Sequence, residues 1–173
     1  MTVPTRLSCL VSLLVVLGAG LPAAAQTPQA IGTYRDWTAF TYQNGNEKVC
    51  YMASDPKREV GDYSERGDAW TLVTHRSPGA KDVISIIAGY NYQQDKPVTV
   101  TIGNSDFGLF SQGDTAWTFG DSGEDDRAMV AAMKAGVDMV VVGYSWRGTK
   151  TTDTYSLLGF TAAYEAISKA CPN

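Results

Sequence analysis

One segment, residues 145–171, constrains the fold of this chain more than any other. Its pattern predicts the end of a strand, a tight turn at Gly148-Thr149, a second strand over residues 150–158, and a short helix capped by Thr161 that ends in a cysteine. Four side chains of that helix share one face, at positions i, i+4, i+7 and i+11: Phe160, Tyr164, Ile167 and Cys171. The cysteine is therefore expected to point toward whatever the helix packs on.

Residues 1–25 are expected to be a cleaved signal peptide. Arg6 precedes an apolar run over residues 7–21, and Ala23-Ala24-Ala25 forms a small-residue cleavage site before Gln26. The run is shorter than the roughly 20 residues that a membrane-spanning helix needs. Cys9 lies inside the run and not at the cleavage point, which argues against a lipoprotein. The sequence predicts an exported protein, periplasmic, outer-membrane-associated or secreted, with no transmembrane segment in residues 26–173.

Cleavage would leave two of the three cysteines, Cys50 and Cys171. In an oxidising compartment such a pair is most simply a structural disulfide. Closing a loop of about 120 residues contributes about 4–5 kcal/mol in the chain-entropy account. A redox or metal role is not expected, because the chain has no C-x-x-C spacing and only one histidine.

Short apolar or alternating segments, separated by turn residues, fill residues 26–173 and predict a single domain. Strands are expected at residues 34–42, 47–54, 69–76, 82–92, 97–102, 106–112, 115–119, 137–147 and 150–158. A first helix is expected between Ser122, as its N-cap, and Gly136. About nine antiparallel strands and two short helices indicate a mainly β protein, either a β-sandwich or a partly open barrel.

Residues 55–68 are expected to form a solvated loop, the longest of the domain. They contain five acidic and three basic residues together with Pro56, Gly61 and Gly67.

The whole chain has a formal net charge of −4, and loss of Arg6 would make it −5, from 13 basic against 18 acidic residues. Without a basic cluster, nucleic acid is not an expected partner.

No pattern in the sequence indicates a catalytic, cofactor-binding or metal-binding residue. His75, the only histidine, is expected at the surface near the end of a strand. Asp36 and Asp153 could be offered as a glycosidase pair, but no pattern brings them together. The chain has no nucleophile elbow, dinucleotide-binding fingerprint or P-loop. Four acidic residues could hold calcium but more simply stabilise a helix N-terminus: Asp121, Glu124, Asp125 and Asp126.

The four tryptophans all fall in predicted strands: Trp37, Trp70, Trp117 and Trp146. Such residues can form a face that stacks on sugars or peptides, although in a small β domain a place in the core is favoured for each. Arg147-Gly148-Thr149 is similar to an integrin-binding Arg-Gly-Asp tip but lacks the aspartate. A hairpin turn is the expected role of that segment.

Several short motifs resemble those of the invasion-associated locus B family. They are Asp36-Trp37, Cys50-Tyr51, Ala116-Trp117, the segment 131–136 (AAMKAG), and above all the segment 147–160 (RGTKTTDTYSLLGF) followed by Cys171. The resemblance implies an exported envelope protein of Gram-negative alphaproteobacteria with a β-sandwich-like fold. The family is named for a member linked to the entry of a pathogen into red cells. The resemblance supplies no catalytic residue or cofactor.

These observations favour an exported, envelope-associated binding module without catalytic activity, whose partner is an envelope protein, a peptide or a glycan. Two alternatives are open. One is an enzyme acting on envelope polymers through Asp36 or Asp153, which requires a concave pocket. The other is a small inhibitor of another enzyme that inserts the 55–68 loop or a hairpin tip as a wedge, which requires a protruding loop.

Overall fold

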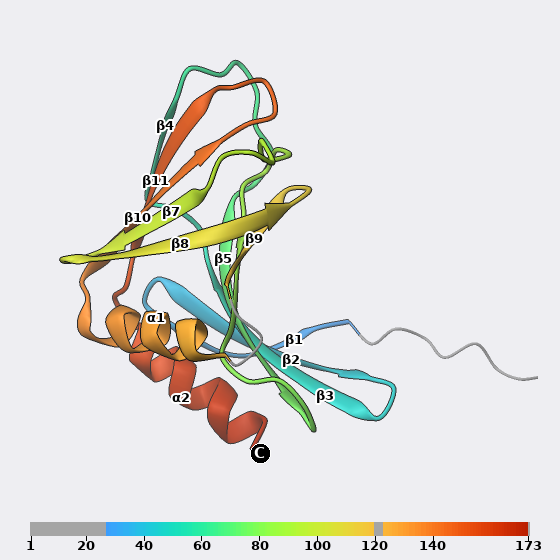
Figure 1. Cartoon of the computed structure of the whole chain (residues 1–173). Coiled ribbons are helices and arrows are strands. Elements are labelled where there is room, and N and C mark those ends of the chain that lie inside the picture. Colours follow the sequence, from blue (N-terminus) through green and yellow to red (C-terminus); the bar gives the residue numbers. More distant parts are fainter. Residues whose placement is uncertain (1–26, 120–122, 173) are drawn as a thin grey trace, which may run out of the picture.

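The computed structural model describes residues 27–119 and 123–172 and contains eleven strands and two helices (Figure 1). The expected signal peptide, the expected helix cap Ser122 and the acidic Asp121 lie outside the described residues. In chain order the elements are β1 (Gln29–Tyr34), β2 (Trp37–Asn44), β3 (Glu47–Ser54), β4 (Arg58–Gly61), β5 (Trp70–Ser77), β6 (Val83–Ile87), β7 (Val98–Ile102), β8 (Ser105–Gln112), β9 (Thr115–Thr118), α1 (Glu124–Ala135), β10 (Asp138–Tyr144), β11 (Lys150–Ser156) and α2 (Phe160–Ala170). None of the helices in the described ranges is long and apolar enough to cross a membrane.

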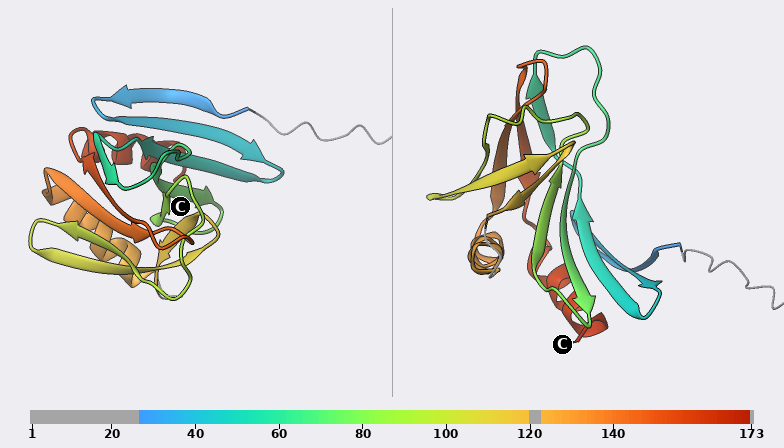
Figure 2. Two further views of the ribbon diagram at one scale, coloured as in Figure 1. Left: turned by 90° about the horizontal axis from the view of Figure 1, so that it is seen from above. Right: turned by 45° about the vertical axis from the view of Figure 1, so that its right-hand side comes forward.

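All eleven strands belong to one open antiparallel sheet in the order β1-β2-β3-β5-β6-β9-β8-β7-β10-β11-β4. The sheet coils strongly instead of forming a flat layer (Figure 2). Its two edge strands are β1 and β4. The expectation of a mainly β, sandwich-like or open-barrel-like domain is confirmed, with two strands more than expected.

The two additional strands, β1 and β4, are the edges of the sheet. β1 pairs only with β2, through a register shift between Ala30 and Gly32. β4 pairs only with β11, and all four of its residues are exposed. An edge strand can be polar on both faces, because its stability comes from backbone hydrogen bonds to one neighbour. Neither segment therefore shows the alternation that predicts a strand, and the expectation of an unbroken 55–68 loop is wrong.

The core forms where alternating strand residues face inward beneath the two helices. In β7, Val98, Val100 and Ile102 are buried while the intervening threonines are half-buried, as the period-2 pattern predicts. The central strand β6 is shorter than the expected 82–92 strand, and only one of its faces is fully buried.

Helix α1 buries Met129, Val130 and Met133. Met129 and Met133 lie one turn apart on the same buried face, whereas Ala135 is exposed. The N-cap position is Gly123.

Helix α2 packs on β1, β2, β3 and β5. It begins after Gly159 and not at Thr161, so the predicted threonine cap is wrong. Gly159 has a φ of +91°, and a Cβ atom there would collide with the backbone carbonyl of Tyr34. Only glycine allows the helix to start so close to the end of β1.

The disulfide between Cys50 and Cys171 is confirmed, with a Cα–Cα distance of 5.9 Å. It joins the C-terminal end of α2 to β3, and both cysteines are buried. At the other end of the helix, Phe160 packs edge-on against Trp37 at 5.0 Å between ring centroids. The Trp37 indole donates a hydrogen bond of 2.9 Å to the Ser156 carbonyl at the end of β11. Helix α2, β2 and β11 therefore meet at Trp37.

Replacing both cysteines by alanine is expected to lower the free energy of unfolding by about 2–5 kcal/mol, because the unfolded chain regains the freedom of a loop of about 120 residues. Urea denaturation of the wild-type and double-variant proteins measures this. Wild-type protein treated with a reductant should match the variant. Equal stability of the oxidised wild-type and the variant would contradict this role of the disulfide.

Candidate functional site

One concave site is lined by the loop that follows β4, by Tyr90 and by the turn between β10 and β11. These segments lie at the same end of the molecule (Figure 1). The volume of the site is about 390 Å³. We call it the loop-end cleft. It is lined by Asp62, Tyr63, Ser64, Glu65, Arg66, Tyr90, Ser145, Trp146, Arg147, Thr149 and Thr151.

The first wall of the cleft is the 62–69 loop, which a buried ion pair fixes in place. Arg66 donates from both terminal nitrogens to the two carboxylate oxygens of Asp153 on β11, each at 2.6 Å. Its Nε donates to the Ala88 carbonyl at 2.7 Å. Only 3% of the Arg66 side chain and 4% of the Asp153 side chain are exposed. A loop that composition describes as solvated is thus fastened to the interior.

The electrostatics of this pair keep Arg66 charged. Burial disfavours the guanidinium charge, but the hydrogen bonds and negative charge of Asp153 outweigh that effect and raise the pKa of Arg66 above its ordinary value. Glu59 on β4 adds a longer contact of 3.5 Å. Because both oxygens of Asp153 accept from Arg66, this carboxylate is poorly placed to exchange a proton with a substrate.

Two further contacts join the segments next to Arg66. The Gly67 amide donates to the Gly89 carbonyl at 3.0 Å. Gly89 has a φ of +71°, and a Cβ atom there would collide with the Gly67 carbonyl, so a glycine is required where the two segments cross. Beside this crossing, the Tyr90 and Thr151 hydroxyls share a hydrogen bond of 2.6 Å.

The second wall is the turn between β10 and β11. Within it, Ser145 donates from its amide to the Thr149 carbonyl at 2.9 Å, and the Gly148 amide donates to the Ser145 carbonyl at 2.8 Å. The Trp146 amide donates to the Asn91 carbonyl at 2.8 Å, which ties the turn to the neighbouring segment. The walls are therefore held by hydrogen bonds within the chain.

Trp146 departs most from its expected place. It lies on the turn and not in a strand, and 62% of it is exposed. The Arg147 guanidinium lies 4.8 Å from the centre of its ring, a cation–π contact. The core position expected for each tryptophan is correct for Trp37, whereas Trp70 is partly exposed at the start of β5.

Asp36 and Asp153 do not form a catalytic pair. Asp153 points to the buried face of β11, whereas Asp36 contacts Ser156, whose side chain lies on the other face of that strand. The hydrogen bond with Ser156, and then that with Lys57 at 3.1 Å, lowers the pKa of Asp36. Each carboxylate therefore belongs to its own ion pair.

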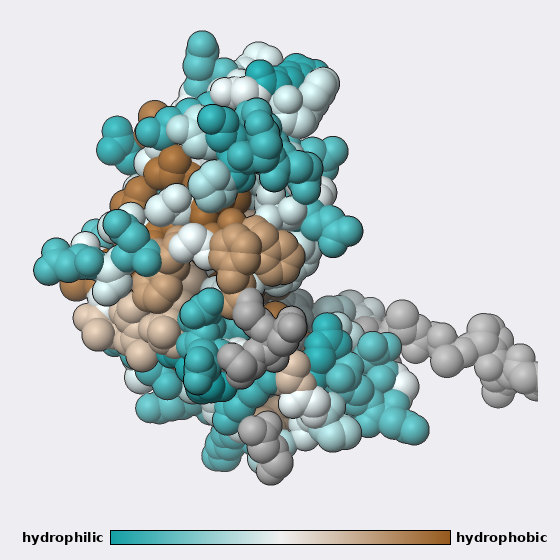
Figure 3. Space-filling view, in the orientation of Figure 1, coloured by the Kyte–Doolittle hydropathy of each residue, from teal (hydrophilic) through white to brown (hydrophobic). Residues whose placement is uncertain are grey.

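A second surface feature is an aromatic patch on the outer side of β8 and β9, formed by Phe110, Trp117 and Phe119. Phe110 lies 5.8 Å from Trp117 and 5.6 Å from Phe119 between ring centroids. An open groove of about 410 Å³ runs from this patch to Val83 and Ile84. Figure 3 shows hydrophobic surface gathered on this side of the molecule, bordered by hydrophilic residues.

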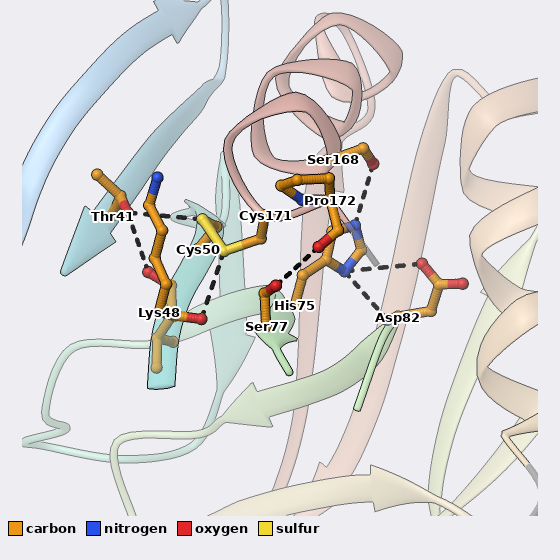
Figure 4. The surroundings of a disulfide bond; sticks show 10 residues. Thr41, Lys48, Cys50, His75, Ser77, Asp82, Ser168, Cys171 and Pro172 are labelled. Atoms are coloured by element: carbon orange, nitrogen blue, oxygen red, sulfur yellow. Dashed lines mark hydrogen bonds and ion pairs between the residues drawn. A yellow bond between two sulfur atoms is a disulfide. The ribbon is translucent and has the colours of Figure 1, made fainter. Parts of the chain in front are cut away.

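His75 is buried beneath α2, with 1% exposed, so its expected surface position is wrong (Figure 4). Its Nε2 lies 3.1 Å from the Ser168 hydroxyl, and its Nδ1 accepts the backbone N–H of Asp82 at 3.1 Å. The Asp82 carboxylate accepts a hydrogen bond of 2.6 Å from Tyr164 and lies 3.8 Å from Nδ1. The alternation of β5 could have signalled this position, because His75 follows Thr71 and Val73 on the inward face.

Ser168, His75 and Asp82 superficially resemble a hydrolase triad, but the tautomer is the opposite of the one needed. Nδ1 accepts a hydrogen bond, so in the neutral ring the proton is on Nε2, which donates to Ser168. The histidine therefore cannot take a proton from the Ser168 hydroxyl. The cluster joins α2 to β5 and to the β5–β6 connection.

One of the acidic residues at the start of α1, Asp126, has structural partners. Asp126 accepts hydrogen bonds from the Thr118 hydroxyl at 2.7 Å and from the Ile84 amide at 3.1 Å. Within residues 27–119 and 123–172, no three histidine, cysteine, aspartate or glutamate side chains gather in an arrangement that could hold a metal ion.

The family described as "Invasion associated locus B (IalB) protein" has a model that matches residues 37–168. The chain belongs to this family. The IalB match includes Arg66, Asp153 and the Trp146 turn, and therefore both walls of the loop-end cleft. A comparison with curated proteins found no match.

Replacing Asp153 with asparagine is expected to lower the free energy of unfolding by about 3–5 kcal/mol, because it leaves the Arg66 charge buried without its partner. Urea denaturation measures the loss. The matched control is Glu47→Gln, which breaks the more exposed Arg76–Glu47 pair of 2.8 Å and should cost no more than about 1 kcal/mol. Equal losses of unfolding free energy in the two variants would show that the buried pair contributes no more to stability than the exposed pair.

The stability of the protein is expected to fall as the pH is lowered below about 6.5, the ordinary pKa of histidine. Burial lowers the pKa of His75 in the fold and, with the charges of Lys81 and Lys134, outweighs the opposing charge of Asp82. The unfolded chain therefore binds a proton at a higher pH than the folded chain, and stability is greatest above that range.

Urea denaturation between about pH 5 and 7 measures this dependence. His75 is the only histidine, so the slope in that window can be assigned to it. His75→Gln should flatten the slope whatever its effect on stability at neutral pH. An unchanged slope in the variant would rule out this assignment.

Proposed function

We propose that this IalB-family protein is an exported, envelope-associated binding module without catalytic activity, and that the loop-end cleft is its binding site. Its partner is another envelope component, a protein, a peptide or a glycan. The observation that carries the proposal is Trp146, a large aromatic side chain left 62% exposed on a hydrogen-bonded turn at a preformed cleft. Exposed tryptophans of this kind are typical of recognition sites.

The state of the titratable groups favours binding over catalysis. Asp153 is saturated by Arg66, and His75 is buried with the wrong tautomer to activate Ser168. The enzyme alternative has one specific observation in its favour, because the carboxylates of Asp62 and Glu65 both line the cleft. It predicts that a ligand is cleaved on prolonged incubation.

The inhibitor alternative is less well supported. It requires the 55–68 loop to protrude as a wedge, whereas β4 pairs this segment with β11 and Arg66 fastens it to the interior. The same segment forms one wall of the loop-end cleft.

Export is supported by two features of the sequence and the structure. Residues 1–25 have the pattern of a cleaved signal peptide. The buried Cys50–Cys171 disulfide suits an oxidising compartment such as the periplasm.

A photocrosslinking amino acid placed at position 146 tests the site in intact cells that express the chain. We expect a reproducible adduct with an envelope component. The matched position is Phe119 in the aromatic patch, which is 52% exposed and does not line the cleft. Adducts at position 119 with none at position 146 would contradict the assignment of the cleft.

A further inference from the structure

We infer that the loop-end cleft binds a neutral carbohydrate, with a sugar ring stacked on Trp146. This inference rests on the proposed function and narrows its ligand to one chemical class. It follows from the kinds of side chain that line the cleft, from the exposure of Trp146, and from the balance of charge.

The lining of the cleft contains no aliphatic side chain. Its eleven residues comprise three aromatic residues, four with aliphatic hydroxyl groups, two carboxylates and two arginines. Pockets for apolar small molecules are lined mainly by hydrophobic side chains, and so are the pockets that hold the apolar anchors of a bound peptide. A sugar differs from both, because it offers hydroxyl groups around its rim and patches of C–H bonds on its faces. Aromatic faces set among polar groups match that pattern.

Trp146 has the geometry of a stacking platform. Its indole is mostly exposed, while its backbone amide is fixed to Asn91. Arg147 lies over one face of the ring at 4.8 Å, which leaves the other face for a ligand. The face of an aromatic ring is electron-rich, so it attracts the C–H bonds of a sugar, which neighbouring oxygens polarise. A preordered platform also loses little conformational freedom on binding.

The charges of the cleft favour a neutral ligand over an anionic one. Arg66 and Asp153 neutralise each other below the surface. The remaining charged groups in the lining are Asp62, Glu65 and Arg147, which sum to −1. Carboxylates accept short hydrogen bonds from hydroxyl groups, so Asp62 and Glu65 suit sugar hydroxyls, whereas they repel phosphate or uronate groups.

The cleft and the aromatic patch are therefore suited to different ligands. The patch of Phe110, Trp117 and Phe119 adjoins the aliphatic Val83 and Ile84, which suits apolar surfaces. The cleft has no such aliphatic side chains in its lining. This contrast provides a control within one molecule.

The test uses the oxidised full-length domain on an array of neutral and acidic oligosaccharides, followed by NMR titration with a neutral hit. The chain has four tryptophans, and Trp146→Phe assigns the indole N–H signal of Trp146. We expect a neutral oligosaccharide to shift that signal saturably. Trp146→Ala should weaken binding about tenfold or more, as expected for loss of an aromatic stacking platform. Phe119→Ala should leave the affinity unchanged.

Trp146 is largely exposed, so its replacement is not expected to unfold the domain, and circular dichroism checks this. Binding restricted to acidic oligosaccharides, or lost in Phe119→Ala but retained in Trp146→Ala, would overturn the inference. Absence of binding to any neutral oligosaccharide would overturn it as well.

The crosslinking experiment separates the two proposals. A protein adduct at position 146 without any glycan binding would leave the proposed binding function standing and remove the carbohydrate ligand. Absence of both would remove both. Mass spectrometry of a bound oligosaccharide after overnight incubation should show it intact, and cleavage would replace the non-catalytic role by the enzyme alternative.

Discussion

The buried pair of Arg66 and Asp153 is the interaction on which the candidate site depends. It connects the segment after the edge strand β4 to the inward face of β11. Arg66 also donates a hydrogen bond to the Ala88 carbonyl, which joins the loop to the segment after β6. Taking two charges out of water is costly, and the cost is offset only when the partners satisfy each other with good geometry. The bidentate arrangement with a further donor to a carbonyl meets that condition. The result is a polar loop held still enough to form one wall of a cleft.

The domain is held together at two separate places. At one, the disulfide and the Trp37–Phe160 contact fix α2 to the strands beneath it, with His75 joining the helix to β5. At the other, the ion pair, the crossing of Gly67 with Gly89, and the tie between Trp146 and Asn91 shape the cleft. Both arrangements contribute to stability, and the second also shapes the cleft. The second leaves Trp146 62% exposed beside the cleft, and the proposed binding function rests on that exposure.

The sequence predicted the features that follow from periodicity and from cysteine pairing. Strand alternation located most of the sheet, and the helical spacing of Phe160, Ile167 and Cys171 correctly turned the cysteine inward. It did not predict β1 or β4, because edge strands need no apolar face. The burial of Arg66 was not predicted, because the composition of residues 55–68 describes the whole segment as polar. Burial of this one charge depends on Asp153, which lies 87 residues away in the sequence. Trp146 was misplaced because a tryptophan next to a turn has the same local pattern whether it packs inward or faces solvent.

Hydrogen exchange at the Gly67 amide shows whether the buried ion pair fixes the loop. This amide directly follows Arg66 in the chain and donates to the Gly89 carbonyl, so its protection reports whether the loop is fastened there. The account predicts slow exchange in the wild-type protein and much faster exchange in Asp153→Asn, while the amide of Met52 in the core strand β3 stays protected in both. Fast exchange at Gly67 in the wild-type protein, or protection that survives the substitution, would contradict the claim that the ion pair builds the site.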